Sequence, residues 1–92
     1  MEEKPERPPW EFLDWLTTNQ MVKLIGDENP QAIAVVVARI GKGDPQKAAD
    51  ILSNFEVELQ GEIMRRMGQL DELSEWIEIG IFEGLRQKYL GQ

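Results

Sequence analysis

The segment Glu28-Asn29-Pro30-Gln31 and, further along the chain, Arg66 carry side chains that could make a specific contact. Asparagine before proline is also an ordinary helix start, because the Asn side chain caps the first turn and proline at the first helical position loses no hydrogen bond. Gln31 would then point to solvent. For this segment the pattern alone therefore favours helix-start chemistry over a binding site.

Arg66 lies in residues 57–67, whose apolar side chains recur at helical spacing. The buried arc of this helix is predicted to contain Leu59, Ile63, Met64 and Met67. On a helical wheel Arg66 falls at the edge of that arc, whereas Arg65 points away from it. An arginine at this border can offer its guanidinium to a partner. It can equally form an internal ion pair with Glu62, four residues earlier, and the sequence leaves both roles open.

Catalytic chemistry has few residues to work with. The chain contains no Cys and no His, which removes thiolate chemistry, disulfides and the side chain that most often acts as a general base or a zinc ligand. Its two Ser and two Thr hydroxyls have no His to activate them. Asp71, Glu72 and Glu75 match no calcium-binding loop and favour a solvated helix start. We therefore expect no enzyme, no metal site and no cofactor.

The net charge of −7 excludes further classes of partner. Phosphate backbones repel such a chain unless its cations cluster, and its arginines are scattered along the sequence. Nucleic-acid binding is therefore not expected. No apolar run approaches the roughly 18–20 residues of a membrane span, and the first residues lack the pattern of a signal peptide. We expect a cytoplasmic protein without direct membrane insertion.

Residues 1–9 carry three of the five prolines among charged neighbours and are predicted to form a disordered, acidic arm. Residues 10–92 are predicted to form one all-α domain of five or six short helices. The expected helices span 10–16, 19–25 after a Thr18 cap, 30–40, 45–53 after an Asp44 cap, 57–67, and 75–90 after a Ser74 cap. Between the third and fourth, Gly41-Lys42-Gly43 is expected to be a flexible turn.

The last of these helices has apolar residues on two faces. Its core stripe is predicted to contain Ile77, Ile81, Phe82, Leu85 and Tyr89, and opposite it lie Trp76, Ile79 and Leu90. A surface helix is normally polar on that second face. Either the segment 10–16 folds back over it, or the face binds a partner or a second copy of the chain.

Three stretches taken in order, LIGDENPQAIA (24–34), DPQKAADIL (44–52) and ELQGEIMRRM (58–67), resemble the middle domain of the flagellar motor switch protein FliG. The resemblance covers roughly residues 10–90 and implies an armadillo-like domain, a compact right-handed stack of helices. It also implies binding to the switch protein FliM through Glu28, Asn29, Pro30, Gln31 and Arg66. Asn29 stands where the family typically has His, and Gly41-Lys42-Gly43 looks like an insertion.

From this resemblance we expect a non-enzymatic scaffold module at the cytoplasmic face of the flagellar basal body. Two alternatives belong to other classes of protein. One is a homo-oligomeric adaptor that uses Trp76, Ile79 and Leu90. The other is a cation-sensing regulatory domain like the helical amino-terminal domain of magnesium transporters.

Overall fold

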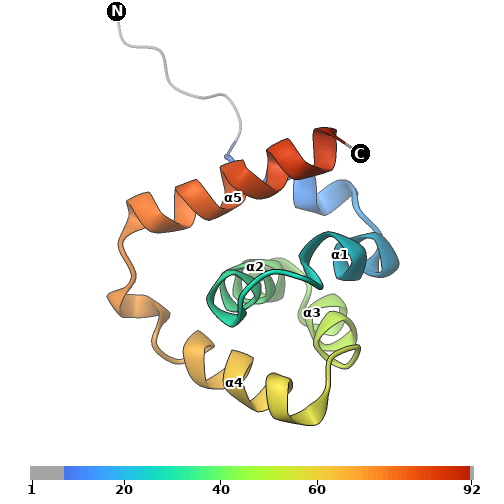
Figure 1. Cartoon of the computed structure of the whole chain (residues 1–92), viewed down its shortest axis with the longest axis vertical. Helices are drawn as coiled ribbons and strands as arrows, with labels where there is room; N and C mark the ends of the chain where they lie inside the picture. The colour runs from blue at the N-terminus through green and yellow to red at the C-terminus, as the bar shows by residue number, and fades with distance from the viewer. Residues whose placement is uncertain (1–7, 92) are drawn as a thin grey trace, which may run out of the picture.

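A computed structural model of the chain describes residues 8–91. It contains five α-helices and two short 3-10 helices, and no strand occurs among these residues. The bounds in chain order are η1 (Glu11–Trp15), α1 (Thr18–Ile25), α2 (Pro30–Gly43), α3 (Pro45–Leu52), α4 (Val57–Met67), η2 (Leu70–Glu72) and α5 (Glu75–Leu90). The predicted all-α single domain is confirmed (Figure 1). Most of the predicted arm, residues 1–7, lies outside the described residues.

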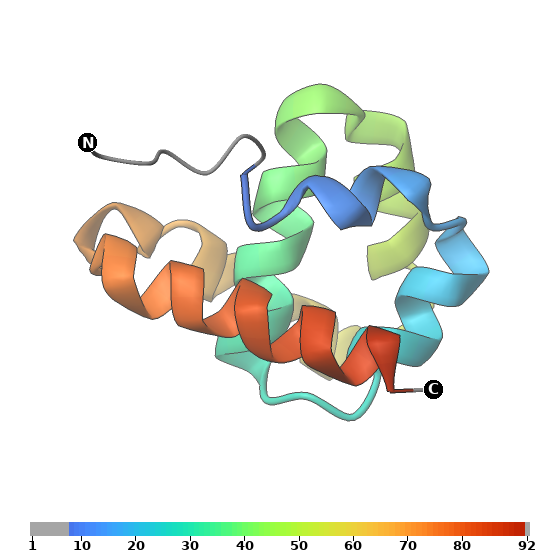
Figure 2. The same ribbon diagram turned by 90° about the horizontal axis from the view of Figure 1, so that it is seen from above.

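Helix α2 is the centre of the domain. The other helices surround it (Figures 1 and 2). Its residues from Ala32 to Val37 are all buried, as is Ile40. β-branched valines have a lower intrinsic helix propensity, but burial on every side outweighs a preference of less than about 1 kcal/mol per residue. Because α2 is packed in the core, the first turn of this helix has a fixed position in the domain.

The turn expected at Gly41-Lys42-Gly43 is wrong, because α2 continues through these residues. The backbone N–H of Asp44 still donates to the carbonyl of Ile40 at 2.8 Å. Asp44 alone makes the turn, and its side chain also accepts from the backbone of Lys47 to cap α3. Local glycine content predicted the turn, whereas packing of α2 against α3 keeps the residues helical.

The helix caps follow the sequence closely. Asn29, Asp44 and Ser74 each accept a backbone hydrogen bond as predicted. The cap of α1 is Thr17 rather than the predicted Thr18. Thr17 and Gln20 form a reciprocal capping box in which each side chain accepts from the other residue's backbone, at 3.1 and 2.8 Å. This second hydrogen bond requires Gln three residues after the cap, which decides between the two adjacent threonines.

The N-terminal 3-10 helix folds back onto α5 (Figure 2). The Trp10 ring lies 5.8 Å from that of Phe82, and Phe12 stacks on Tyr89 at 5.7 Å between centroids. Phe12 and Leu13 are buried, and so is Leu16. Segment 10–16 is therefore an integral part of the core.

Two residues predicted to be buried are exposed, Ile77 on α5 and Met64 on α4. The first turn of α5 extends beyond η1, and η2 lies beside it (Figure 2). Ile77 therefore has little to pack against, although it lies one turn before Ile81, which packs against the core. An apolar stripe gives the orientation of a helix, but not the length over which a neighbour covers it.

Candidate functional site

The candidate segment Glu28 to Gln31 forms the loop before α2 and its first turn. Gly26 ends α1, and a Cβ at this position would lie 2.7 Å from the carbonyl oxygen of Val22. Only glycine fits this close approach without a shift of the backbone. Three residues later Asn29 caps α2, and its side chain accepts from the backbone N–H of Ala32 at 2.9 Å. Asn29 therefore has a structural role at the candidate segment, because it caps the first turn of α2.

Gln31 and Arg66 meet in space although 35 positions separate them in sequence. The guanidinium of Arg66 donates from Nη1 to Oε1 of Gln31 at 3.1 Å. Its Nε donates to Oε2 of Glu62 at 2.5 Å. Arg66 therefore forms the internal ion pair with Glu62 and also lies beside the candidate segment. Both residues remain partly exposed, so their outer hydrogen-bonding groups can reach a partner.

Glu28 is held by a residue that the sequence did not indicate. Lys88, in the last turn of α5, donates from Nζ to Oε2 of Glu28 at 2.9 Å and to Oδ1 of Asp27 at 2.6 Å. It also donates to the backbone carbonyl of Leu24 at 2.7 Å. A lysine near a helix end ordinarily indicates only favourable interaction with the helix dipole. No local pattern links it to a loop about 60 positions earlier.

Ion pairing shifts the pKa values of three groups here. The hydrogen bond from Lys88, with support from its own backbone and the Lys88 charge, lowers the pKa of Asp27 below 3.8. The hydrogen bond from Arg66 is the main reason that the pKa of Glu62 lies below 4.5. The hydrogen bonds to Asp27 and then Glu28 raise the pKa of Lys88 above 10.5. Near neutral pH all three groups are therefore charged and paired.

The second predicted face is only partly covered. Ile79 is half-buried beside Phe12 and Trp15 of the N-terminal segment, around a hollow of about 430 Å³. Trp76 and Leu90 stay 81% and 61% exposed. The N-terminal segment thus covers the part of this face around Ile79, whereas the residues nearer the two ends of the helix face solvent.

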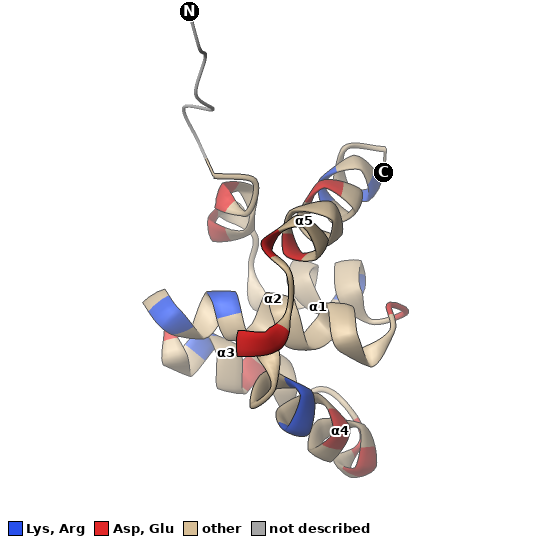
Figure 3. Cartoon of the chain, turned by 90° about the vertical axis from the view of Figure 1, so that its left-hand side faces the viewer, with Lys and Arg blue, Asp and Glu red and all other residues tan. Residues whose placement is uncertain are grey.

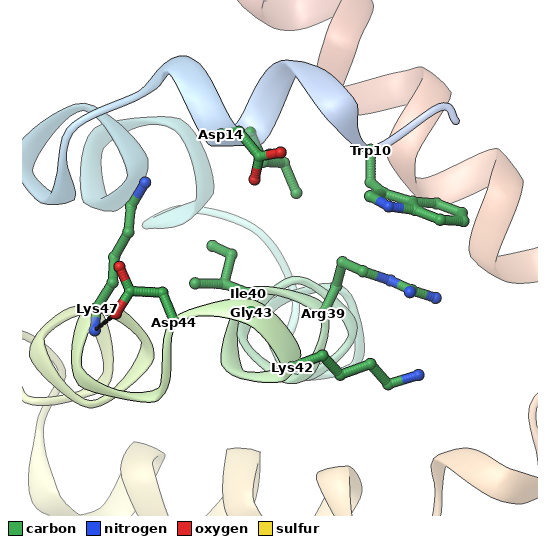
Figure 4. Close-up of a pocket in the computed structure, with 9 residues that line it drawn as sticks. Trp10, Asp14, Arg39, Ile40, Lys42, Gly43, Asp44 and Lys47 are labelled. Carbon is green, nitrogen blue, oxygen red and sulfur yellow. Dashed lines mark hydrogen bonds between the residues drawn. The ribbon is translucent and has the colours of Figure 1, made fainter. Parts of the chain in front are cut away.

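A further cleft, of about 530 Å³, lies between η1 and the corner of α2 and α3 (Figure 4). Arg39 crosses one wall, with its guanidinium carbon 3.9 Å from the centroid of the Trp10 ring. Lys47 is tied to the opposite wall, because its Nζ donates to the carbonyl of Leu16 at 2.6 Å. None of the predicted site residues lines this cleft. Two of its cations, Arg39 and Lys47, thus contact the residues that flank η1, Trp10 and Leu16.

Charge is distributed rather than concentrated. Acidic residues occur on η1, η2, α4 and α5, with basic residues among the helices (Figure 3). Within residues 8–91 no group of three or more His, Cys, Asp or Glu is placed to hold a metal ion. No helix in the same range is long and apolar enough to cross a membrane.

Residues 18–92 match the sequence family described as the FliG middle domain. The chain belongs to this family. It is 34% identical over 83 residues to the flagellar motor switch protein FliG of Thermotoga maritima. The aligned region covers 90% of this chain and 24% of that protein. It is 31% identical over 80 residues to FliG of Bacillus subtilis, covering 87% of this chain and 23% of that protein. The chain therefore spans about a quarter of the length of these FliG relatives.

A shorter stretch of 61 residues is 34% identical to diphthine synthase of Haloarcula marismortui, covering 64% of this chain and 24% of that enzyme. No solved structure matches the chain. The resemblance on which Glu28 to Gln31 and Arg66 were selected is thus confirmed at the level of the family.

Proposed function

We propose that this FliG middle-domain module is a non-enzymatic component of the flagellar motor switch, located on the cytoplasmic side of the basal body, and that it docks a FliM-like protein. The family match and the names of its FliG relatives support the motor switch. The observation that carries the docking site is the hydrogen bond between Gln31 and Arg66. Residues selected from two distant segments adjoin on one surface.

The chemistry of this surface suits a protein partner. Gln31 uses Oε1 as an acceptor towards Arg66, so its amide N–H groups are available as donors. The guanidinium of Arg66 retains N–H groups beyond those given to Gln31 and Glu62. The positive end of α2 lies beside them, and it favours an acceptor or a negative charge on the partner. The site therefore presents donors on a preformed helical frame.

Asn29 keeps the helix start but changes one property of the family motif. Its side chain cannot acquire a proton, whereas the His that is typical at this position can titrate near neutral pH. Binding through this surface should therefore change little between about pH 6 and pH 8. The cap of Asn29 on Ala32 places the adjoining Gln31 in the first turn of α2.

Calorimetry with the middle domain of FliM from the same organism tests the proposal. We expect a dissociation constant on the order of micromolar, weakened at least about tenfold in Gln31→Ala and in Arg66→Ala. Arg65→Ala is the matched control, because Arg65 also pairs with Glu62 but is well exposed and does not contact Gln31. Absence of binding by the wild-type chain would refute the proposed partner. Unchanged affinity in both test variants would remove the site.

A second candidate function is self-association through the ends of α5. Trp76 and Leu90 are large apolar side chains that face solvent, and such residues are common at protein contacts. Sedimentation should then show a dimer that Trp76→Glu converts to a monomer. A monomeric mass at about millimolar concentration excludes this use of α5.

A further inference from the structure

Lys88 links the C-terminal helix to the loop that precedes the proposed docking site. Its ammonium group has three N–H donors, and three oxygens receive them, on Leu24, Asp27 and Glu28. The distances of 2.7, 2.6 and 2.9 Å are those of well-formed charge-assisted hydrogen bonds. Every donor of the side chain is thus directed at one short stretch of chain.

The three acceptors have different consequences for the loop. The carbonyl of Leu24 belongs to the last turn of α1, where backbone carbonyls have no partner within the helix. Asp27 and Glu28 follow in the loop itself, and a single cation between their carboxylates offsets their mutual repulsion. Lys88 therefore fixes the end of α1 and the approach to α2 together, from a third helix.

We propose that Lys88 is a positioning residue of the docking site, which holds Glu28 and the α1–α2 loop in the conformation that the partner meets. The effect on partner binding rests on the proposed function. The ordering of the α1–α2 loop by Lys88 concerns the unbound chain alone. The Oε2 atom of Glu28 is held by Lys88, so the orientation of this carboxylate is set from α5. A change at the end of α5 is consequently transmitted to the binding surface.

The first test measures amide hydrogen exchange in the unbound full chain by NMR. The N–H of Glu28 donates to the carbonyl of Ile25 at 3.0 Å and reports directly on the loop. Lys88→Met keeps the aliphatic stem and removes the charge, so exchange at Glu28 should rise about tenfold while buried Val36 stays protected. Arg86→Met removes a charge from the same helix without a contact to the loop and should leave Glu28 unchanged.

Lys88→Arg should restore most of the protection at Glu28, because a guanidinium also serves several acceptors. Unchanged exchange at Glu28 in Lys88→Met overturns the positioning role. An equal rise at Glu28 and Val36 also overturns it, since that result means a general loss of stability.

The second test measures affinity for the FliM middle domain. Lys88→Met should weaken binding about tenfold, Lys88→Arg should regain most of the loss, and Arg86→Met should match the wild-type chain. Affinity unchanged in Lys88→Met, with faster exchange at Glu28, refutes an effect on the partner. If the wild-type chain does not bind FliM, the proposed function fails, whereas the exchange experiment still decides whether Lys88 orders the loop.

Discussion

The sharpest test of the fold concerns the N-terminal 3-10 helix, which precedes the residues matched by the family. Leu13 on this short helix is 1% exposed and belongs to the same core cluster as Phe82 and Ile25. Leu13→Ala removes buried carbon atoms from this cluster and leaves a cavity. Such substitutions cost about 2–5 kcal/mol, depending on how far the surroundings collapse. Because η1 lies at the edge of the domain and can move inward, we expect about 3 kcal/mol.

That loss is large for a domain of this size. A chain of 92 residues has a free energy of unfolding of about 5–14 kcal/mol. A loss of 3 kcal/mol corresponds to a fall in Tm of about 12–24 °C. Urea unfolding followed by circular dichroism gives the free energy of unfolding directly. The dependence of that free energy on urea concentration should stay the same, because the variant buries nearly the same total surface.

Trp15→Ala is the matched control for Leu13→Ala. Trp15 lies on the same 3-10 helix and is larger, but it is 61% exposed. Its removal should cost less than about 1 kcal/mol. A cost below about 1 kcal/mol for Leu13→Ala as well would refute the packing of η1 into the core. It would mean that residues 18–92 fold without the segment before them.

Three further predictions concern a cap, a glycine and an ion pair. Asn29→Ala should lower the free energy of unfolding by about 1 kcal/mol in urea titrations, and Asn29→Asp should retain most of it, because Asp also accepts from the backbone of the first turn. Gly41→Ala should raise the melting temperature, with a gain of about 0.5–1 kcal/mol, because the residue is helical and the added Cβ would make an ordinary contact 3.5 Å from Cβ of Ala48; a lower melting temperature would contradict this packing. The pKa of Glu62 is lowered in the folded chain, so its contribution to stability is present above pH 4.5 and is lost as the pH falls through the folded-state value. Urea titrations of wild type and Glu62→Gln should therefore differ at pH 7 and converge in acid, as the pH falls through the lowered pKa of Glu62.

Local chemistry explains what the sequence predicted well. The caps at Asn29, Asp44 and Ser74 depend on residues within one turn, and all three are present. The span of α4 follows from apolar spacing along one segment, and its bounds, Val57–Met67, are those predicted. These features need no knowledge of any other part of the chain.

Several features that depend on distant contacts were not predicted. Nothing near Lys88 in the sequence indicates that it reaches Glu28. Likewise, the glycine residues at the end of α2 indicated a turn, but the helix continues to Gly43 where it packs against α3. Periodicity identified the apolar side of α4, but it could not show that Met64 lacks a covering neighbour. For the candidate site, sequence and family resemblance supplied the residues, whereas the geometry required the fold.

The docking surface takes residues from the start of α2 and from α4, so its geometry depends on how these two helices pack. Ile63 is fully buried on α4, between the partly exposed Glu62–Arg66 side of that helix and the core around α2. Ile63→Ala would let α4 shift relative to α2 and would lengthen the contact from Arg66 to Gln31. It should therefore weaken partner binding even under conditions where the chain remains folded. Leu13→Ala, at the far edge of the core, should lower stability alone. Equal effects of the two variants on affinity would show that binding follows global stability rather than the placement of α4 against α2.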